Sequence, residues 1–192
     1  MNEGVNPITR ILWRSDDDGS AERFSGRATA EGWRLEGVVV LPIEGEPAAI
    51  RYHVELDPGW RTRQAEVAID VHAGHRTITF VADGDGGWKV DGAQAEPLDG
   101  CVDVDFGFTP ATNTLQVRRL GLEVGESRTL PVAWLAFPAL TVQPLVQTYT
   151  RLDADRWRYG DEDFTAELVV DPDGYVLRYG DDIWQATAHR SD

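Results

Sequence analysis

Cysteine and lysine are almost absent from this chain, whose 192 residues include one cysteine, Cys101, and one lysine, Lys89. A single cysteine excludes an intramolecular disulfide framework and suits a reducing compartment. The N-terminal stretch MNEGVNPITR carries an acidic residue early and lacks the basic region and apolar stretch of a secretory signal. We therefore expect a cytoplasmic location.

Long apolar runs and clusters of positive charge are also missing. No run approaches the ~20 residues of a membrane-spanning helix, so no integral membrane segment is predicted. The chain has 33 acidic and 18 basic residues, which gives a formal net charge of −15. Nucleic acids and anionic membrane surfaces need clustered cations, so neither is expected as a partner. The negative charge suits either solubility or the steering of a cationic partner.

The length and composition indicate one globular domain. Hydrophobic residues make up 42% of the chain and charged residues 27%, which is typical of a soluble fold. The length is enough for one well-packed core and short for two. Because the sequence shows no linker, low-complexity tract, heptad pattern or internal repeat, we predict a single domain over residues 1–192.

Strand patterns dominate the sequence from end to end. In IRYHVEL (residues 50–56) apolar residues alternate with Arg51, His53 and Glu55, which is the period of a half-buried strand. The residues 57–59, Asp-Pro-Gly, then predict a tight turn. Another turn sequence, Pro-Asp-Gly at 172–174, separates two strand patterns and predicts a hairpin.

The predicted fold is mainly β: a large curled antiparallel sheet, or half-barrel, with one or two short helices packed over it. Many twisted strands in one sheet favour curling. Residues 38–43 (VVVLPI) and 132–140 (VAWLAFPAL) are apolar on both faces, which predicts that both faces are covered. A helix is predicted to begin near residues 109–114 and to end at Gly121. Residues 144–152 suit a strand better than a second helix.

Signatures of metal, covalent and cofactor chemistry are weak or missing. His72 and His75 are three residues apart but straddle a turn and lack further ligands, so no metal site is predicted. Residues 83–87 (DGDGG) lie between two strand patterns and are predicted to be a turn rather than a calcium loop. There is no nucleophile motif, phosphate-binding loop or dinucleotide fingerprint, so we expect no cofactor.

The stretch GCVDVDFGFTPATNTLQVRRLGL (residues 100–122) carries the most unusual chemistry. Asp103 and Asp105 stand in a strand pattern, where Asp is disfavoured. They share one face about 7 Å apart, a separation that permits the two carboxylates of a glycosidase. Arg118 and Arg119 follow. These arginines either pair with the aspartates in a structural corner or hold an anionic or hydroxyl-rich head group.

A second cationic element precedes the apolar stripe of residues 65–71. Alternation places Arg61 and Arg63 on the same predicted face as that stripe. An arginine at the mouth of an apolar groove suits an amphiphile, whose tail would bury along the stripe while its head meets the guanidinium. The alternative is that Arg63 pairs with Asp57 or Asp105 and has a structural role.

Five segments, which span nearly the whole chain, carry a resemblance to a known family. They are RYHVELDPGWRTRQAEV (51–67), GGWKVDG (86–92), LDGCVDVDFGFTPATNTLQVRRL (98–120), AWLAFPALTVQPLVQTYTRL (133–152) and FTAELVVDPDGYVLRY (164–179). The chain resembles the putative glycolipid-binding family, with Gln116 at a position where we expect proline. The resemblance implies a curved antiparallel half-barrel similar to the periplasmic lipoprotein carriers, with helices over its opening and a hydrophobic ligand.

We therefore predict a non-enzymatic protein that binds an amphiphile, such as a glycolipid or fatty-acyl molecule, on the concave face of the sheet. The predicted site residues are Arg63, Arg118 and Arg119 as head-group contacts, Asp103, Asp105 and Asn113 as partners of those arginines or of hydroxyls, and Trp60 and Trp134 as apolar wall. Two alternatives stay open: a hydrolase of sugar or lipid conjugates that uses Asp103 and Asp105, and a scaffold without a small ligand.

Overall fold

The computed structural model describes residues 8–72 and 74–191. The strands in chain order are β1 Ile8–Arg14, β2 Ala21–Thr29, β3 Gly32–Ile43, β4 Glu46–Leu56, β5 Thr62–Val71, β6 Gly74–Ala82, β7 Trp88–Val90, β8 Ala93–Gln94, β9 Val104–Phe106, β10 Ser127–Leu135, β11 Val142–Arg151, β12 Arg156–Gly160, β13 Thr165–Val170, β14 Val176–Tyr179 and β15 Trp184–Ser191. The helices are the 3₁₀-helix η1, Glu96–Leu98, and the α-helix α1, Asn113–Leu120.

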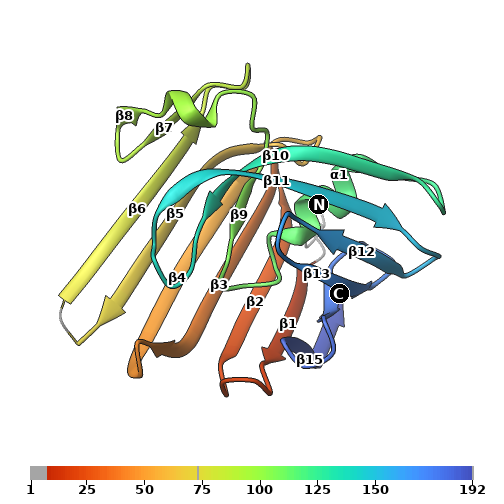
Figure 1. Cartoon of the computed structure of the whole chain (residues 1–192), viewed down its shortest axis with the longest axis horizontal. Helices are drawn as coiled ribbons and strands as arrows, with labels where there is room; N and C mark the ends of the chain where they lie inside the picture. The colour runs from red at the N-terminus through yellow and green to blue at the C-terminus, as the bar shows by residue number, and fades with distance from the viewer. Residues whose placement is uncertain (1–7, 73, 192) are drawn as a thin grey trace, which may run out of the picture.

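These strands form one sheet in the order β8-β7-β6-β5-β4-β3-β2-β1-β15-β14-β13-β12-β11-β10-β9. Every neighbouring pair is antiparallel except β9 and β10, which are parallel. The prediction of a mainly β, antiparallel fold with a short helix is confirmed. The predicted curl into a half-barrel is not found, because the sheet runs openly from β8 to β9 and is neither closed nor strongly curled. In Figure 1, β2 to β6 form a broad layer, and β10 and β11 cross in front of it.

The end strand β9 packs against the face of that broad layer. The Phe106 ring lies 5.8 Å from the Tyr52 ring of β4 and 5.9 Å from the Phe80 ring of β6. Leu115 of α1 joins the same apolar core and is fully buried. The space between the layers is therefore filled by the protein's own side chains.

The alternation of β4 predicts its buried and exposed faces correctly, whereas the prediction that the apolar run of β3 is covered on both faces is wrong. In β4, Ile50 and Val54 are fully buried while Arg51 is exposed. In β3, the apolar run was predicted to be covered on both sides, yet Val39 is fully buried and Val40 is 51% exposed. The outer face of β3 is open, and an unbroken apolar run gives no sign of which residues point outward.

A bulge at the start of β5 overturns the predicted face of Arg63. The register shifts between Glu55 and Leu56, so that Leu56 pairs with Thr62 and Glu55 pairs with Gln64. Arg63 is the extra residue and is exposed, whereas Thr62 is buried. A bulge re-aims side chains on one strand, so strict alternation fails at that point.

The later elements follow the predicted pattern. Residues 144–152 fall almost wholly in strand β11, and the Pro-Asp-Gly turn joins β13 to β14 as a hairpin. Helix α1 ends at Gly121, whose φ of 55° lies in the left-handed region that glycine adopts readily after a helix. The residues of DGDGG form a turn in which Asp83 Oδ1 accepts the N–H groups of Asp85 and Gly87.

Candidate functional site

Asp103 lies just before β9 and is fully buried against Arg119 of α1. Arg119 Nε donates to Asp103 Oδ1 at 3.2 Å and to Oδ2 at 3.0 Å, and Nη2 donates to Oδ2 at 2.6 Å. Burial raises the pKa of the Asp103 carboxyl, and the Arg119 guanidinium acts in the opposite direction. The charges of Asp103 and Arg119 therefore pair with each other. This is the structural corner that the sequence analysis gave as one of two roles for the arginines.

Asp105 is also buried, but its partners are neutral. Its Oδ1 accepts from the Thr112 hydroxyl at 2.6 Å, and its Oδ2 accepts from Gln147 Nε2 at 2.7 Å. The Phe106 N–H donates to the Thr112 hydroxyl oxygen, so the Thr112 hydrogen is free to point at Asp105. Within residues 8–72 and 74–191, no cation forms an ion pair with Asp105. Burial raises the pKa of this carboxyl above its ordinary value.

A pocket of about 370 Å³ opens beside Asp105. It lies between β9 and the start of α1 on one side and the strands β12, β14 and β15 on the other. Asn113, Phe137, Tyr159, Asp161 and Trp184 are among its lining residues. Asp103 does not line it, so the two aspartates of the predicted pair do not face this pocket together.

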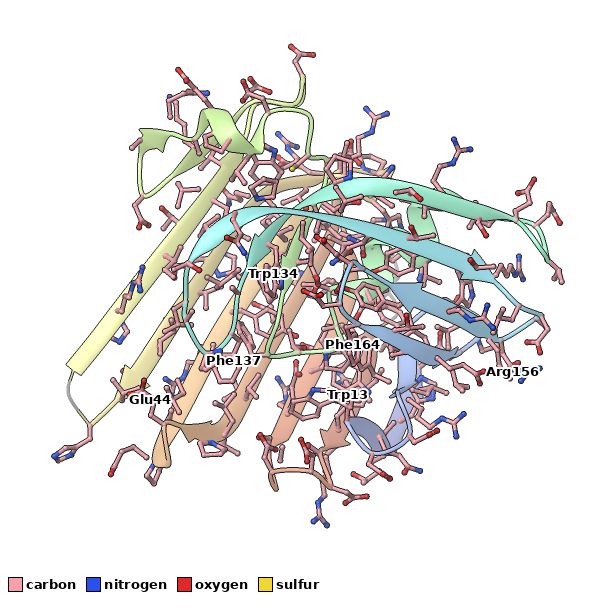
Figure 2. The ribbon with its side chains drawn as sticks, viewed as in Figure 1. Trp13, Glu44, Trp134, Phe137, Arg156 and Phe164 are labelled. Atoms are coloured by element: carbon pink, nitrogen blue, oxygen red, sulfur yellow. The ribbon has the colours of Figure 1, made fainter. Side chains whose placement is uncertain are left out.

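Aromatic side chains form much of the pocket wall. Phe164 and Tyr179 are stacked with ring centroids 6.1 Å apart and an interplanar angle of 10°. The Tyr159 ring lies 6.0 Å from that of Tyr179. Phe164 is 39% exposed at the rim. Phe164 comes from the turn before β13 and Phe137 from the turn after β10 (Figure 2).

Hydrogen bonds connect the polar groups around the pocket. Gln147 Nε2 donates to the Tyr159 hydroxyl at 3.2 Å as well as to Asp105, and the Tyr159 hydroxyl donates to Asp161 Oδ2 at 2.7 Å. Burial first, and then the nearby Asp105 and Asp161 carboxyls, raise the pKa of Tyr179. Its hydroxyl therefore stays protonated and is available as a donor.

Asn113 is the first residue of α1 and lines the same pocket. Its Nδ2 donates to the Tyr149 hydroxyl at 2.7 Å. The predicted site residues Asp105 and Asn113 are thus brought together at one pocket.

Glu22 of β2 is a buried acid that sequence reasoning missed. It is 0% exposed, and it accepts hydrogen bonds from the Tyr52 hydroxyl and, at 2.6 Å, from the Thr109 hydroxyl. Burial raises the pKa of Glu22 to about 7. Because Thr109 lines the pocket beside Asp105, Glu22 lies directly behind the pocket wall. The sequence carried one sign of this burial: strand alternation places Glu22 on the same face as the apolar Phe24.

Arg118, a predicted head-group contact, does not line the pocket beside Asp105. Its guanidinium carbon lies 4.1 Å from the Trp60 ring centroid, 4.9 Å from that of Trp33 and 5.5 Å from that of Tyr175. Nη1 donates to the main-chain oxygen of Asp173. Arg118 is thus held against three aromatic rings, and Trp60, predicted as a ligand wall, packs on this arginine.

Arg63 and Trp134 also lie outside the Asp105 pocket. Arg63 is 3.6 Å from Glu31 across exposed side chains, rather than beside Asp57 or Asp105. It lines a larger hollow of about 620 Å³ on the outer face. That hollow is less suitable as a site because Arg34, also in its lining, is already paired with glutamates. Trp134 is partly buried and pairs in register with Asp105, but it is not among the pocket-lining residues.

The part of the chain that the structure describes contains neither a cluster of metal ligands nor a membrane-spanning helix. No group of three or more His, Cys, Asp or Glu side chains there could hold a metal ion; His75 instead contacts Asp70 and Thr77. No helix there has the length and apolar character to cross a bilayer. The first seven residues, on which the expected location partly depends, lie outside the described residues.

Comparison with known proteins identifies relatives over most of the chain. The family described as "Putative glycolipid-binding" matches residues 10–185. The fold is similar to the crystal structure of a DUF1089 family protein from Pseudomonas aeruginosa, with a TM-score of 0.78 and 33% sequence identity. That similarity covers 89% of this chain and 94% of the other. No curated protein sequence matches the chain.

Proposed function

Because this chain belongs to the putative glycolipid-binding family, we propose that it binds the sugar head group of an amphiphile in the pocket beside Asp105. The observation that carries the proposal is the combination of aromatic walls with buried hydrogen-bonding groups in one hollow. Pockets of this composition hold small ligands by apolar contact and fix their orientation with a few polar groups.

The polar groups suit hydroxyls. Asp105 and Asp161 carry acceptor oxygens, and the Tyr179 hydroxyl is a donor. Sugar hydroxyls both donate and accept, so they can satisfy such a mixed set. The apolar faces of a sugar ring can lie against Phe164 or Phe137, which provide broad apolar area with little rotamer entropy to lose.

The size of the pocket limits which part of the ligand it holds. A volume of about 370 Å³ is at the lower end of the roughly 300–1,000 Å³ of ligand pockets. It accommodates a head group and the first part of a chain, not a complete lipid. The tail would leave over the exposed rim at Phe164, because the interior between the sheet layers is filled by residues such as Phe80 and Leu115.

The proposal is tested by titrating octyl β-D-glucoside, below its micelle concentration, into the purified protein and following binding by calorimetry. We expect saturable binding that Phe164→Ala weakens severalfold. Val146→Ala is the matched control, since Val146 is 58% exposed on β11 and does not line the pocket. Equal affinities for wild type and both variants, or no binding at all, would overturn the proposal.

A further inference from the structure

Asp103 and Asp105 are both buried, but within the described part of the chain only Asp103 is paired with a cation. Both carboxylate oxygens of Asp103 accept hydrogen bonds from the guanidinium of Arg119. Asp105, two residues away and also buried, accepts hydrogen bonds from a hydroxyl and an amide. A buried carboxylate without a cation is costly, because neutral donors replace only part of the lost hydration. The uncompensated member of the pair is the one that lines the pocket.

Among the described residues, the pocket lining supplies no positive charge. It contains two acids, Asp105 and Asp161, and no Arg, Lys or His from residues 8–72 and 74–191. The two arginines of helix α1 are engaged elsewhere, Arg118 by aromatic rings and Arg119 by Asp103. A phosphate or carboxylate head group would therefore meet two acids and no cation in this lining.

The walls of the pocket favour a cation independently of the acids. The lining includes the rings of Phe137, Tyr159, Phe164, Tyr179 and Trp184. The faces of aromatic rings carry negative potential and attract ammonium groups within about 6 Å. The chain's net charge of −15 also raises the local concentration of cationic ligands around the protein.

We propose that the pocket beside Asp105 selects a head group that carries a protonated amine, such as an amino sugar, with the ammonium placed between Asp105 and the aromatic wall. This inference rests on the proposed function, since it assigns the chemical class of the head group at the same site. The ammonium supplies the missing countercharge of Asp105, and the remaining hydroxyls bond to the polar groups around it.

Three matched amphiphiles separate this inference from the general proposal. They are octyl β-D-glucoside, octyl 2-amino-2-deoxy-β-D-glucoside and the N-acetylated form of the latter, which keeps the nitrogen but removes its charge. For the wild-type protein at neutral pH, we expect the amine to bind about tenfold more tightly than either neutral compound.

The variant Asp105→Asn keeps the shape of the side chain and removes its charge. We expect it to abolish the preference for the amine while octyl β-D-glucoside still binds. Glu44→Gln removes one exposed charge at the far turn of the sheet (Figure 2) and should leave the preference intact. The wild-type comparison of the amine with its N-acetyl form needs no variant, so it decides the question even if Asp105→Asn fails to fold.

The outcomes are distinguishable. Tighter binding of the amine that depends on Asp105 supports the inference. If the neutral glucoside binds but the amine binds no more tightly, the inference fails and the proposed function stands. If none of the three compounds binds, both fail.

Discussion

The guanidinium of Arg119 contacts both carboxylate oxygens of Asp103, and this pair joins the end of helix α1 to the start of strand β9. The Asp103 side chain is completely shielded from solvent, and the Arg119 side chain is 18% exposed. Arg119, which was predicted as a head-group contact, therefore has a structural role. Its pairing with Asp103 helps to position β9, and with it Asp105.

Removal of Arg119 should destabilise the protein strongly. Arg119→Met leaves Asp103 as an unpaired buried charge, and we expect a loss of about 3 to 5 kcal/mol in the free energy of unfolding. The double variant Asp103→Leu with Arg119→Met should lose less, since no unpaired charge remains. Urea denaturation measures both losses, with Arg128→Met, at an exposed position of β10, as the control. A double variant whose loss equals the sum of the losses of Arg119→Met and of Asp103→Leu alone would contradict the pairing.

Glu22 should make the protein less stable as pH rises. Its pKa is about 7 in the folded state against an ordinary value of 4.5. Between these values the unfolded state releases the proton while the folded state keeps it, so stability falls as pH rises through this window and the loss is complete above pH 7. The full effect is about 3 kcal/mol.

Glu22→Gln tests this effect because the amide resembles the protonated acid. We expect the variant to match wild type near pH 4.5 and to exceed its unfolding free energy by up to about 3 kcal/mol at pH 8. Glu31→Gln, at an exposed side chain, should change neither value. If wild type and Glu22→Gln show the same pH dependence, Glu22 does not titrate in this way.

Arg118 should contribute to stability but not to ligand affinity. Its guanidinium packs on Trp60 and Trp33, and contacts of this kind contribute about 1 to 2 kcal/mol when shielded. Arg118→Met should lower the unfolding free energy by that amount and leave octyl β-D-glucoside binding unchanged. Arg158→Met, at an exposed position of β12, is the control for loss of charge. Weakened binding in Arg118→Met alone would assign Arg118 to the site after all.

Gln116 offers a stabilising substitution. It is fully buried in α1, and its Nε2 has no hydrogen-bond partner among the described residues. Its Oε1 only accepts a long bond of 3.4 Å from Tyr149, whose hydroxyl lies at a similar 3.3 Å from Gln147 Oε1. Gln116→Met should therefore raise the unfolding free energy by about 1 kcal/mol. A thermal denaturation midpoint below that of wild type would contradict this, with exposed Gln94→Met as the control.

The fold class could be predicted because local patterns decide it. Alternation, turn residues and the glycine after α1 each indicate the structure found, and the resemblance to the family is confirmed over residues 10–185. The predictions failed where tertiary context, rather than the local sequence pattern, decides which residues are covered. The bulge at Arg63 and the open outer face of β3 at Val40 depend on which neighbours pack nearby.

The site could be predicted only in part for a similar reason. Asp105 and Asn113 stand in the unusual central segment and do line the pocket. The opposite wall comes from Tyr159, Phe164 and Trp184, which look like ordinary strand residues in the sequence. They reach Asp105 only because β12 to β15 return to β9, and no local pattern reports such a long-range approach.

The pairing of β1 with β15 has a consequence for how the chain is made on the ribosome. These strands lie side by side in the sheet, and Thr9 and Ser191, whose hydroxyls are 3.0 Å apart, are separated by 182 positions in the sequence. Strands β1 to β6 can pair as soon as they emerge, but the free edge of β1 stays open until translation reaches β15. A nascent chain stalled before Trp184 therefore exposes a sheet edge that other chains can join, and it should depend on chaperones more than the complete protein does.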